Sequence, residues 1–126
     1  MKPNLVDSIT APDLTVLQQF EPEVFAEPIS SATSSTLSQF MVSAVENGAA
    51  TNARIDGVSV AGKTGTAENG EDDPYTLWFT GFAPADNPRV AIAVVVEDGG
   101  GEDQSGSGNS IAAPIAKRVL EAVLSK

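Results

Sequence analysis

The sequence contains no cysteine and no histidine, and it has only 7 basic residues against 17 acidic ones. Without cysteine, disulfides and thiolate metal sites are excluded, and without histidine the usual general base and the commonest metal ligand are missing as well. Any acid–base chemistry must therefore use Lys, Ser, Tyr or carboxylates. We expect neither a metal nor another cofactor.

Positive charge is scarce, and the formal net charge of the chain is −10. Such a surface repels phosphate backbones, which argues against nucleic acid as a partner. The acidic residues are densest at 68–73 and 97–103, where Gly, Asn or Pro predict solvated loops. Glu71, Asp72 and Asp73 are therefore interpreted as loop residues and not as a metal site.

Long apolar runs are also missing, because none approaches the roughly twenty residues that a membrane-spanning helix needs. The first residues, Met1 to Asp7, lack the pattern of a signal peptide. We therefore expect this segment to make no membrane contact of its own. A length of 126 residues suffices for one domain of ordinary size.

The first half of the chain predicts an irregular region followed by a helix. Four prolines within the first 28 residues predict an irregular or short-stranded lead-in over residues 1–29. Over residues 30–48, apolar side chains recur at steps of three and four, and an Asn-Gly pair closes the pattern, so a helix is expected there. Ser30 and Ser31 are its candidate N-caps.

The second half predicts strands and then a helix. Residues 57–97 contain three β-branched or aromatic stretches separated by turn residues, which indicates an antiparallel meander. The third stretch, 89–96, is almost entirely apolar, as expected of a strand covered on both faces. An acidic, Gly-rich loop at 98–109 is expected to be flexible. An amphipathic helix follows over 110–125, with Pro114 in its first turn.

These elements predict an α/β fold of the α+β type, in which helices pack on an antiparallel sheet. We expect the last helix across one face of the sheet and the 30–48 helix near the other. The second strand carries Trp78, Phe79 and Phe82. At least two of these aromatic residues are expected in the core, and not in a platform for ligand stacking.

The most specific motif is Lys63-Thr64-Gly65, flanked by Ala-Gly before it and by Thr66 and an alanine after it. The stretch 78–84 follows on the next predicted strand, with Ile-Ser ahead of the first helix and Ala-Pro-Ile in the last. This combination resembles the third motif of the penicillin-binding proteins, which are related to the serine β-lactamases. The resemblance covers most of the chain and is greatest to the class B enzymes of actinobacteria.

The resemblance implies a peptidoglycan D,D-transpeptidase, whose partners are D-Ala-D-Ala stem peptides and β-lactams. Lys63, Thr64 and Thr66 would bind the carboxylate of the peptide or antibiotic through charge-assisted hydrogen bonds. Gly65 would let the substrate backbone lie against the strand. Lys63 would also favour proton transfer, and the Thr66 amide would supply half of the oxyanion hole, so these two are the candidate catalytic residues.

The resemblance also implies parts that this chain lacks. No serine has a lysine three positions later, so the Ser-x-x-Lys pair that carries the nucleophile is missing. Ser107-Gly108-Asn109 spells Ser-x-Asn, but it follows the Lys-Thr-Gly strand instead of preceding it, and we interpret it as a coincidence. A complementary N-terminal segment would supply both motifs and two further strands of a five-stranded sheet. The parent enzyme would be anchored at the extracytoplasmic face of the bacterial membrane.

Two alternative interpretations stay open. Residues Gly57 to Thr64 also match the pattern G-x-x-x-x-G-K-T of a phosphate-binding loop, and Glu97 and Asp98 after an apolar strand could hold its magnesium ion. Such a loop must follow a buried strand and open a helix, whereas polar residues precede the pattern here and turn residues follow it. The second alternative is a non-catalytic module that captures a peptide carboxylate on an open strand edge.

Overall fold

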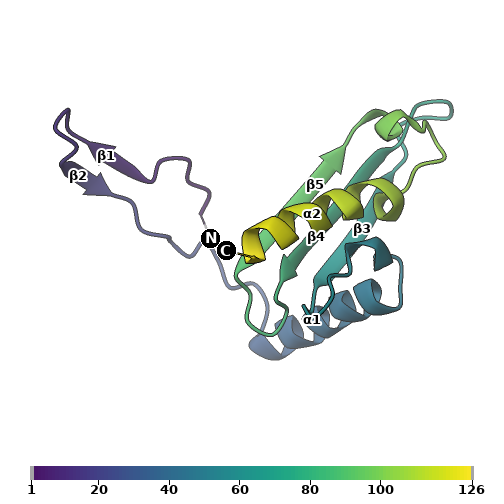
Figure 1. Ribbon diagram of the computed structural model, residues 1–126, viewed down its shortest axis with the longest axis horizontal. Coiled ribbons are helices and arrows are strands. Elements are labelled where there is room, and N and C mark those ends of the chain that lie inside the picture. Colours follow the sequence, from purple (N-terminus) through teal and green to yellow (C-terminus); the bar gives the residue numbers. More distant parts are fainter. Residues whose placement is uncertain (1, 126) are drawn as a thin grey trace. The chain divides into compact units, whose positions relative to one another are not determined.

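An N-terminal hairpin and a three-stranded sheet with two helices make up the computed structural model, which describes residues 2–125 (Figure 1). The chain divides into two compact units, residues 1–33 and 34–126. Within residues 2–125, no helix is long and apolar enough to cross a bilayer.

The N-terminal unit contains two short strands, β1 (Ser8–Thr10) and β2 (Val16–Gln19), which pair antiparallel. The short-stranded form of the predicted lead-in is therefore present. In the connecting turn, the Asp13 carboxylate accepts a hydrogen bond of 3.1 Å from the Thr15 amide. Hydrogen bonds from Thr15 lower the pKa of Asp13, so they stabilise the turn at neutral pH and are lost as acid protonates the carboxylate.

The first helix, α1 (Ser31–Glu46), lies where the apolar periodicity predicted it. The Ser30 hydroxyl accepts a hydrogen bond of 3.1 Å from the Thr33 amide, which confirms Ser30 as the capping residue. At the other end, the guanidinium of Arg54 donates to the carbonyls of the last two helical residues. A cation at this end also complements the helix dipole.

The sheet is the predicted meander, with strand order β3-β4-β5 and antiparallel pairing throughout. Its strands are β3 (Ala61–Ala67), β4 (Thr76–Ala83) and β5 (Val90–Val96). Within the described residues, β3 is an edge strand that pairs only with β4. Its position leaves the outer edge of the Lys-Thr-Gly strand free.

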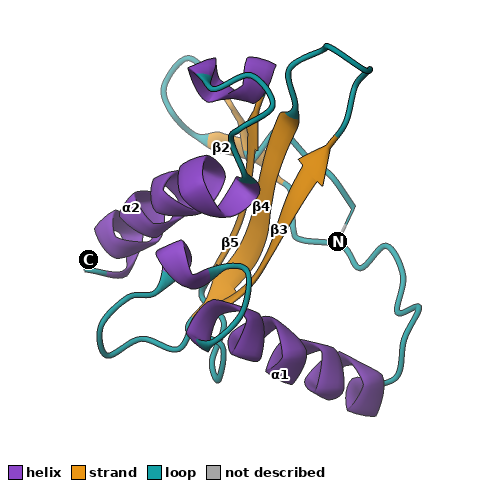
Figure 2. Cartoon of the chain, turned by 90° about the vertical axis from the view of Figure 1, so that its right-hand side faces the viewer, coloured by secondary structure: helices purple, strands orange, loops and turns teal. Residues whose placement is uncertain are grey.

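The last helix, α2 (Ala113–Leu124), follows a wide π-type turn at Gly108–Ala112 and covers one face of the sheet (Figure 2). Phe79 and Leu77 of β4 point toward this face and are fully buried. The core residues of α2 and its lead-in are small except for one leucine: Ala112, Ala113, Ala116 and Leu120. Burial of a large apolar side chain contributes roughly 1.5 to 3 kcal/mol. The largest contributions to this layer are therefore expected from its largest fully buried side chains, Phe79, Leu77 and Leu120.

The opposite face of the sheet is open in the described part of the chain. Trp78 and Val95 lie there and keep 45% and 49% of their surface exposed, and Ala91 and Ala93 are exposed beside them. The expectation that β5 is covered on both faces is therefore wrong for residues 2–125. Of the three aromatic residues of β4, only Phe79 is in the core, while Phe82 is half-buried.

The position of α1 also differs from the expectation. Its one buried side chain, Val45, joins the same core as α2, on the covered face of the sheet. Met41 instead lines a shallow hollow of about 400 Å³ that includes Thr80 and Ala93 of the open face. The predicted placement near the second face is therefore correct for Met41 and wrong for the buried end of the helix.

The acidic, Gly-rich segment 98–109 is packed, in contrast to the flexible loop that its composition predicts. Gly99, Gly106 and Gly108 are buried. The side-chain amide of Gln104 donates to the carbonyls of Glu71 and Asp73, at 2.9 and 3.0 Å. Composition fails here because glycines that permit close packing look the same in sequence as glycines of a mobile linker.

Candidate active-site strand

The four predicted site residues all lie on β3, but they do not share one face of the sheet. Lys63 pairs with Thr80 and Gly65 pairs with Trp78, which places Lys63 on the open face. Because side chains alternate along a strand, Thr64 and Thr66 point toward the face that carries α2. The groups can therefore meet a common ligand only at the free edge of β3.

Lys63 carries an exposed ammonium group. Its Nζ donates to the carbonyl oxygen of Thr64 at 2.5 Å. The ion pairs of residues 2–125 join other lysines, namely Lys2 with Glu23 and Lys117 with Glu121, so no carboxylate of the described chain neutralises Lys63. In a protein of net charge −10, this is an exposed positive charge available to an anion.

The two threonines differ in their surroundings. Thr64 is half-buried, and its hydroxyl donates to the carbonyl of Ala49, just after α1, at 3.2 Å. Thr66 is exposed. Donation from Thr64 to a bound carboxylate therefore requires this hydroxyl to leave Ala49, whereas Thr66 can reach a ligand at the strand edge without losing a buried contact.

The glycines of the motif are explained by close packing. A Cβ at Gly62 would lie 2.5 Å from Cζ of Phe79, so glycine is needed for the ring to pack beneath β3. A Cβ at Gly65 would lie 3.2 Å from Cβ of Trp78, which is tighter than most such contacts. The two glycines of the Gly-Lys-Thr-Gly pattern therefore fit a strand that packs closely on both faces, with Gly62 against Phe79 and Gly65 against Trp78.

The phosphate-binding-loop interpretation is wrong. Lys63 and Thr64 lie inside β3, and the residues between Ala67 and Thr76 form bends and irregular backbone, not the helix that phosphate binding requires. No cluster of three or more potential metal ligands is found among residues 2–125. The acidic loop residues Glu71, Asp72 and Asp73 are exposed.

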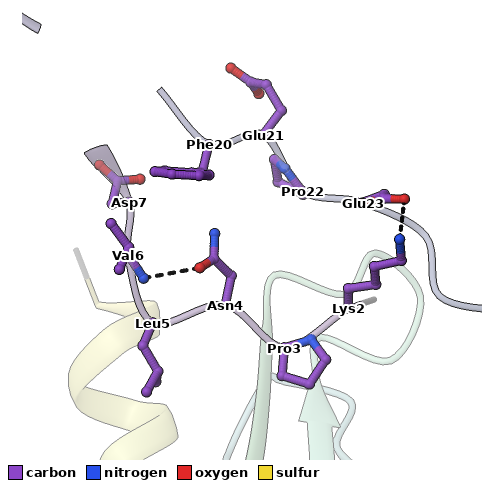
Figure 3. Close-up of a pocket in the computed structure, with 10 residues that line it drawn as sticks. All are labelled: Lys2, Pro3, Asn4, Leu5, Val6, Asp7, Phe20, Glu21, Pro22 and Glu23. Carbon is purple, nitrogen blue, oxygen red and sulfur yellow. Dashed lines mark hydrogen bonds and ion pairs between the residues drawn. The ribbon is translucent and has the colours of Figure 1, made fainter. Parts of the chain in front are cut away.

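A separate hollow of about 520 Å³ lies in the N-terminal unit (Figure 3). It is lined by two stretches, Lys2–Asp7 and Phe20–Glu23. An ion pair between Lys2 and Glu23 closes one side. The hollow contains none of the motif residues, and the ammonium group that lines it, that of Lys2, is already paired with Glu23.

One residue beside the motif was missed in the sequence. Gly108, which the sequence analysis assigned to a coincidental Ser-x-Asn match in a flexible loop, is buried directly against Gly65 and Trp78. A signal was present in the sequence, because Ser107 and Ser110 are three positions apart, a spacing that can cap a helix. This signal places a helix start there, but it does not indicate contact with β3.

Residues 1–121 match the family described as the penicillin binding protein transpeptidase domain. The chain belongs to this family. The peptidoglycan D,D-transpeptidase PbpA of Mycolicibacterium smegmatis is 42% identical over 98% of the chain, and that of Mycobacterium tuberculosis is 40% identical over the same share. The chain spans about a quarter of the length of these relatives.

Solved structures of the family have the same fold. The ceftriaxone acyl-enzyme complex of penicillin-binding protein A from M. tuberculosis is 40% identical to this chain, with a TM-score of 0.89 over 98% of the chain and 28% of that structure. The D,D-transpeptidase domain of a peptidoglycan glycosyltransferase from Eggerthella lenta is 33% identical, with a TM-score of 0.81 over 94% of the chain and 26% of that structure. The chain therefore folds as a fragment of the penicillin-binding protein transpeptidase fold.

Proposed function

We propose that this chain is the C-terminal part of a D,D-transpeptidase domain that cross-links peptidoglycan stem peptides through a serine acyl-enzyme. The observation that carries the proposal is the exposed Lys63 ammonium, without a carboxylate partner in residues 2–125, on the free edge of a strand whose sequence is that of the family's Lys-Thr-Gly motif. The chain supplies this strand, and a complementary segment supplies the nucleophile.

In this proposal, the D-Ala-D-Ala end of a stem peptide lies along β3 as an added strand. Lys63 and Thr66 bind its terminal carboxylate, and Gly65 leaves room for its backbone. The serine oxygen of the complementary segment attacks the penultimate carbonyl, the Thr66 amide stabilises the resulting oxyanion, and D-alanine departs. An amine of a second stem peptide then takes the acyl group and frees the serine. A β-lactam acylates the same serine.

The arrangement supports a division of labour between the two segments. This chain binds and polarises the substrate, whereas the Ser-x-x-Lys and Ser-x-Asn motifs of the complementary segment activate the nucleophile and carry protons. No cofactor is needed for these steps. The place of action that fits the substrate is the extracytoplasmic face of the membrane, with the anchor in another part of the parent protein.

This division predicts that the chain alone forms no covalent adduct with benzylpenicillin, and that an adduct appears when the complementary N-terminal segment is added. The physical reason is that no serine of the chain has the lysine that would activate it. Intact-mass spectrometry measures the result directly. The control is a complementary segment whose nucleophilic serine is replaced by alanine, which must remain unlabelled. An adduct on the chain by itself would contradict the proposal.

A further inference from the structure

The main chain of Gly108 lies directly against the backbone of the Lys-Thr-Gly strand. A Cβ at this position would lie 2.3 Å from the carbonyl oxygen of Trp78 and 2.7 and 3.1 Å from the oxygen and nitrogen of Gly65. All three neighbours are backbone atoms, which cannot rotate away as a side chain does. Position 108 therefore accepts no side chain unless β3 or the turn itself moves.

The requirement for glycine here is one of space and not of backbone conformation. Positive φ angles in this segment occur at Gly99, Gly100 and Gly101, which adopt 62° to 87°, and at Asp98 and Asp103, whereas Gly108 is not among the residues with positive φ. An alanine at 108 would thus have an ordinary backbone conformation, and its cost would come from the collision with β3 and β4.

The turn that presents Gly108 is fixed by its own hydrogen bonds. Ser107 and Ser110 form a reciprocal capping box, each side chain bonding the other's amide at 3.0 Å. Asn109 is tied to the short 3-10 turn Thr51–Ala53: its Oδ1 accepts from the Asn52 amide at 3.0 Å, and its carbonyl accepts from the Asn52 side chain at 3.0 Å. These hydrogen bonds therefore hold the turn that places Gly108 against β3.

Thr64, which precedes Gly65 in the motif, is held by the same part of the structure. Thr64 donates to the carbonyl of Ala49, two residues before the turn to which Asn109 is tied. Thr64 and Gly65 are thus both held from the α2 side, while Trp78 contacts Gly65 from the open face. The strand edge is located by main-chain contacts and by one threonine hydroxyl.

We propose that Gly108 is a positioning residue of the transpeptidase site, which sets the location of Gly65 and, through it, of the Thr66 amide that donates to the oxyanion. The inference rests on the proposed function of β3. A Cβ at 108 pushes the Gly65 backbone outward, so the Thr66 amide no longer meets the developing charge at hydrogen-bond distance. Misplacement of about 1 Å in such a group costs up to about a hundredfold in rate.

The test uses the complete domain, formed by this chain and its complementary segment. Gly108→Ala is expected to lower the rate constant of penicillin acylation roughly tenfold, because part of the displacement is absorbed by the turn. Gly106→Ala is the matched control: Gly106 is also buried, and the three atoms nearest to a Cβ there are the carbonyl oxygen of Gly99 at 2.9 Å and the side-chain Cδ1 atoms of Leu77 and Ile111 at 3.0 and 3.1 Å, none of which belongs to β3. It should acylate at nearly the wild-type rate, whatever its melting temperature.

The carbonyl stretch of the acyl-enzyme supplies a readout that loss of stability does not move. Weaker hydrogen bonds to the ester carbonyl raise its stretching frequency, so infrared spectra should show a higher frequency for Gly108→Ala and an unchanged one for Gly106→Ala. Equal rates and equal frequencies for the two variants would overturn the inference. If the wild-type domain gave no adduct at all, the proposed function would fail and this inference with it.

A second variant covers the case in which Gly108→Ala does not fold. Asn109→Ala removes the side-chain bonds to the Thr51–Ala53 turn and leaves Gly108 in place. It is expected to slow acylation roughly threefold, with a smaller shift of the carbonyl frequency in the same direction. An Asn109→Ala domain with the wild-type rate and frequency would count against the inference.

Discussion

Replacement of Lys63 with alanine in the complete domain is expected to slow acylation by benzylpenicillin roughly tenfold or more, about 1.4 kcal/mol of transition-state stabilisation. The side chain is exposed on β3 and lacks a carboxylate partner within residues 2–125, so its charge is free to act on a ligand. Under the proposed function, its removal eliminates the charge-assisted hydrogen bond that Lys63 donates to the antibiotic's carboxylate. Stopped-flow or quenched labelling over a range of antibiotic concentrations gives the rate constant.

Lys117→Ala is the matched control, because it removes the same charge from α2, where the lysine is 3.8 Å from Glu121 on the same helix. Its acylation rate should equal that of the wild type. Lys63→Arg should recover part of the lost rate, since the charge is kept while the geometry of donation changes. A Lys63→Ala domain that acylates at the wild-type rate, or a similar loss in Lys117→Ala, would refute the role assigned to Lys63.

Replacement of Phe79 with alanine is expected to lower the free energy of unfolding of the complete domain by roughly 3 to 5 kcal/mol. The ring is fully buried and lies beneath two glycines, since a Cβ at Gly62 or Gly81 would lie 2.5 or 3.0 Å from its atoms. Its removal leaves a cavity between β3, β4 and the helices that the strands cannot close without leaving their register. Equilibrium denaturation with urea measures the change.

Phe79→Leu is the corresponding control and is expected to cost only roughly 1 to 2 kcal/mol, because most of the apolar volume remains. The pair separates loss of packing from loss of the ring itself. A cost below about 1 kcal/mol for Phe79→Ala would mean that the site collapses freely, contrary to the close packing around Gly62 and Gly81.

The order of elements was predictable because each has a strong local signal. The 3.6-residue spacing marks α1, and the alternating turn residues mark the meander β3-β4-β5. The two-sided cover of β5 was predicted wrongly, because an entirely apolar strand does not show which of its faces has a partner in the same chain. The expectation that at least two of the three aromatic residues of β4 lie in the core was wrong for the same reason, because only Phe79 is buried.

The site was predictable in part. Lys63 and its neighbours form a local motif, and the structure places them together on one strand at a free edge, while their role as a substrate-binding strand stays a prediction. The contacts of Thr64 with Ala49 and of Gly65 with Gly108 join segments 15 and 43 residues apart. Such contacts depend on tertiary packing, so the periodicity and composition of a single sequence do not contain them.

The way in which the Gly-rich segment is packed affects which of its positions can vary in evolution. Gly108 faces backbone atoms and Gly106 faces one carbonyl and two side chains, whereas Glu102, Asp103 and Ser105 are exposed. Neutral drift should therefore accumulate at the exposed positions and leave Gly108 unchanged. A library that randomises this segment in the complete domain would then diversify at the exposed positions, and the sequences that still fold would reveal how much room is left behind the edge strand.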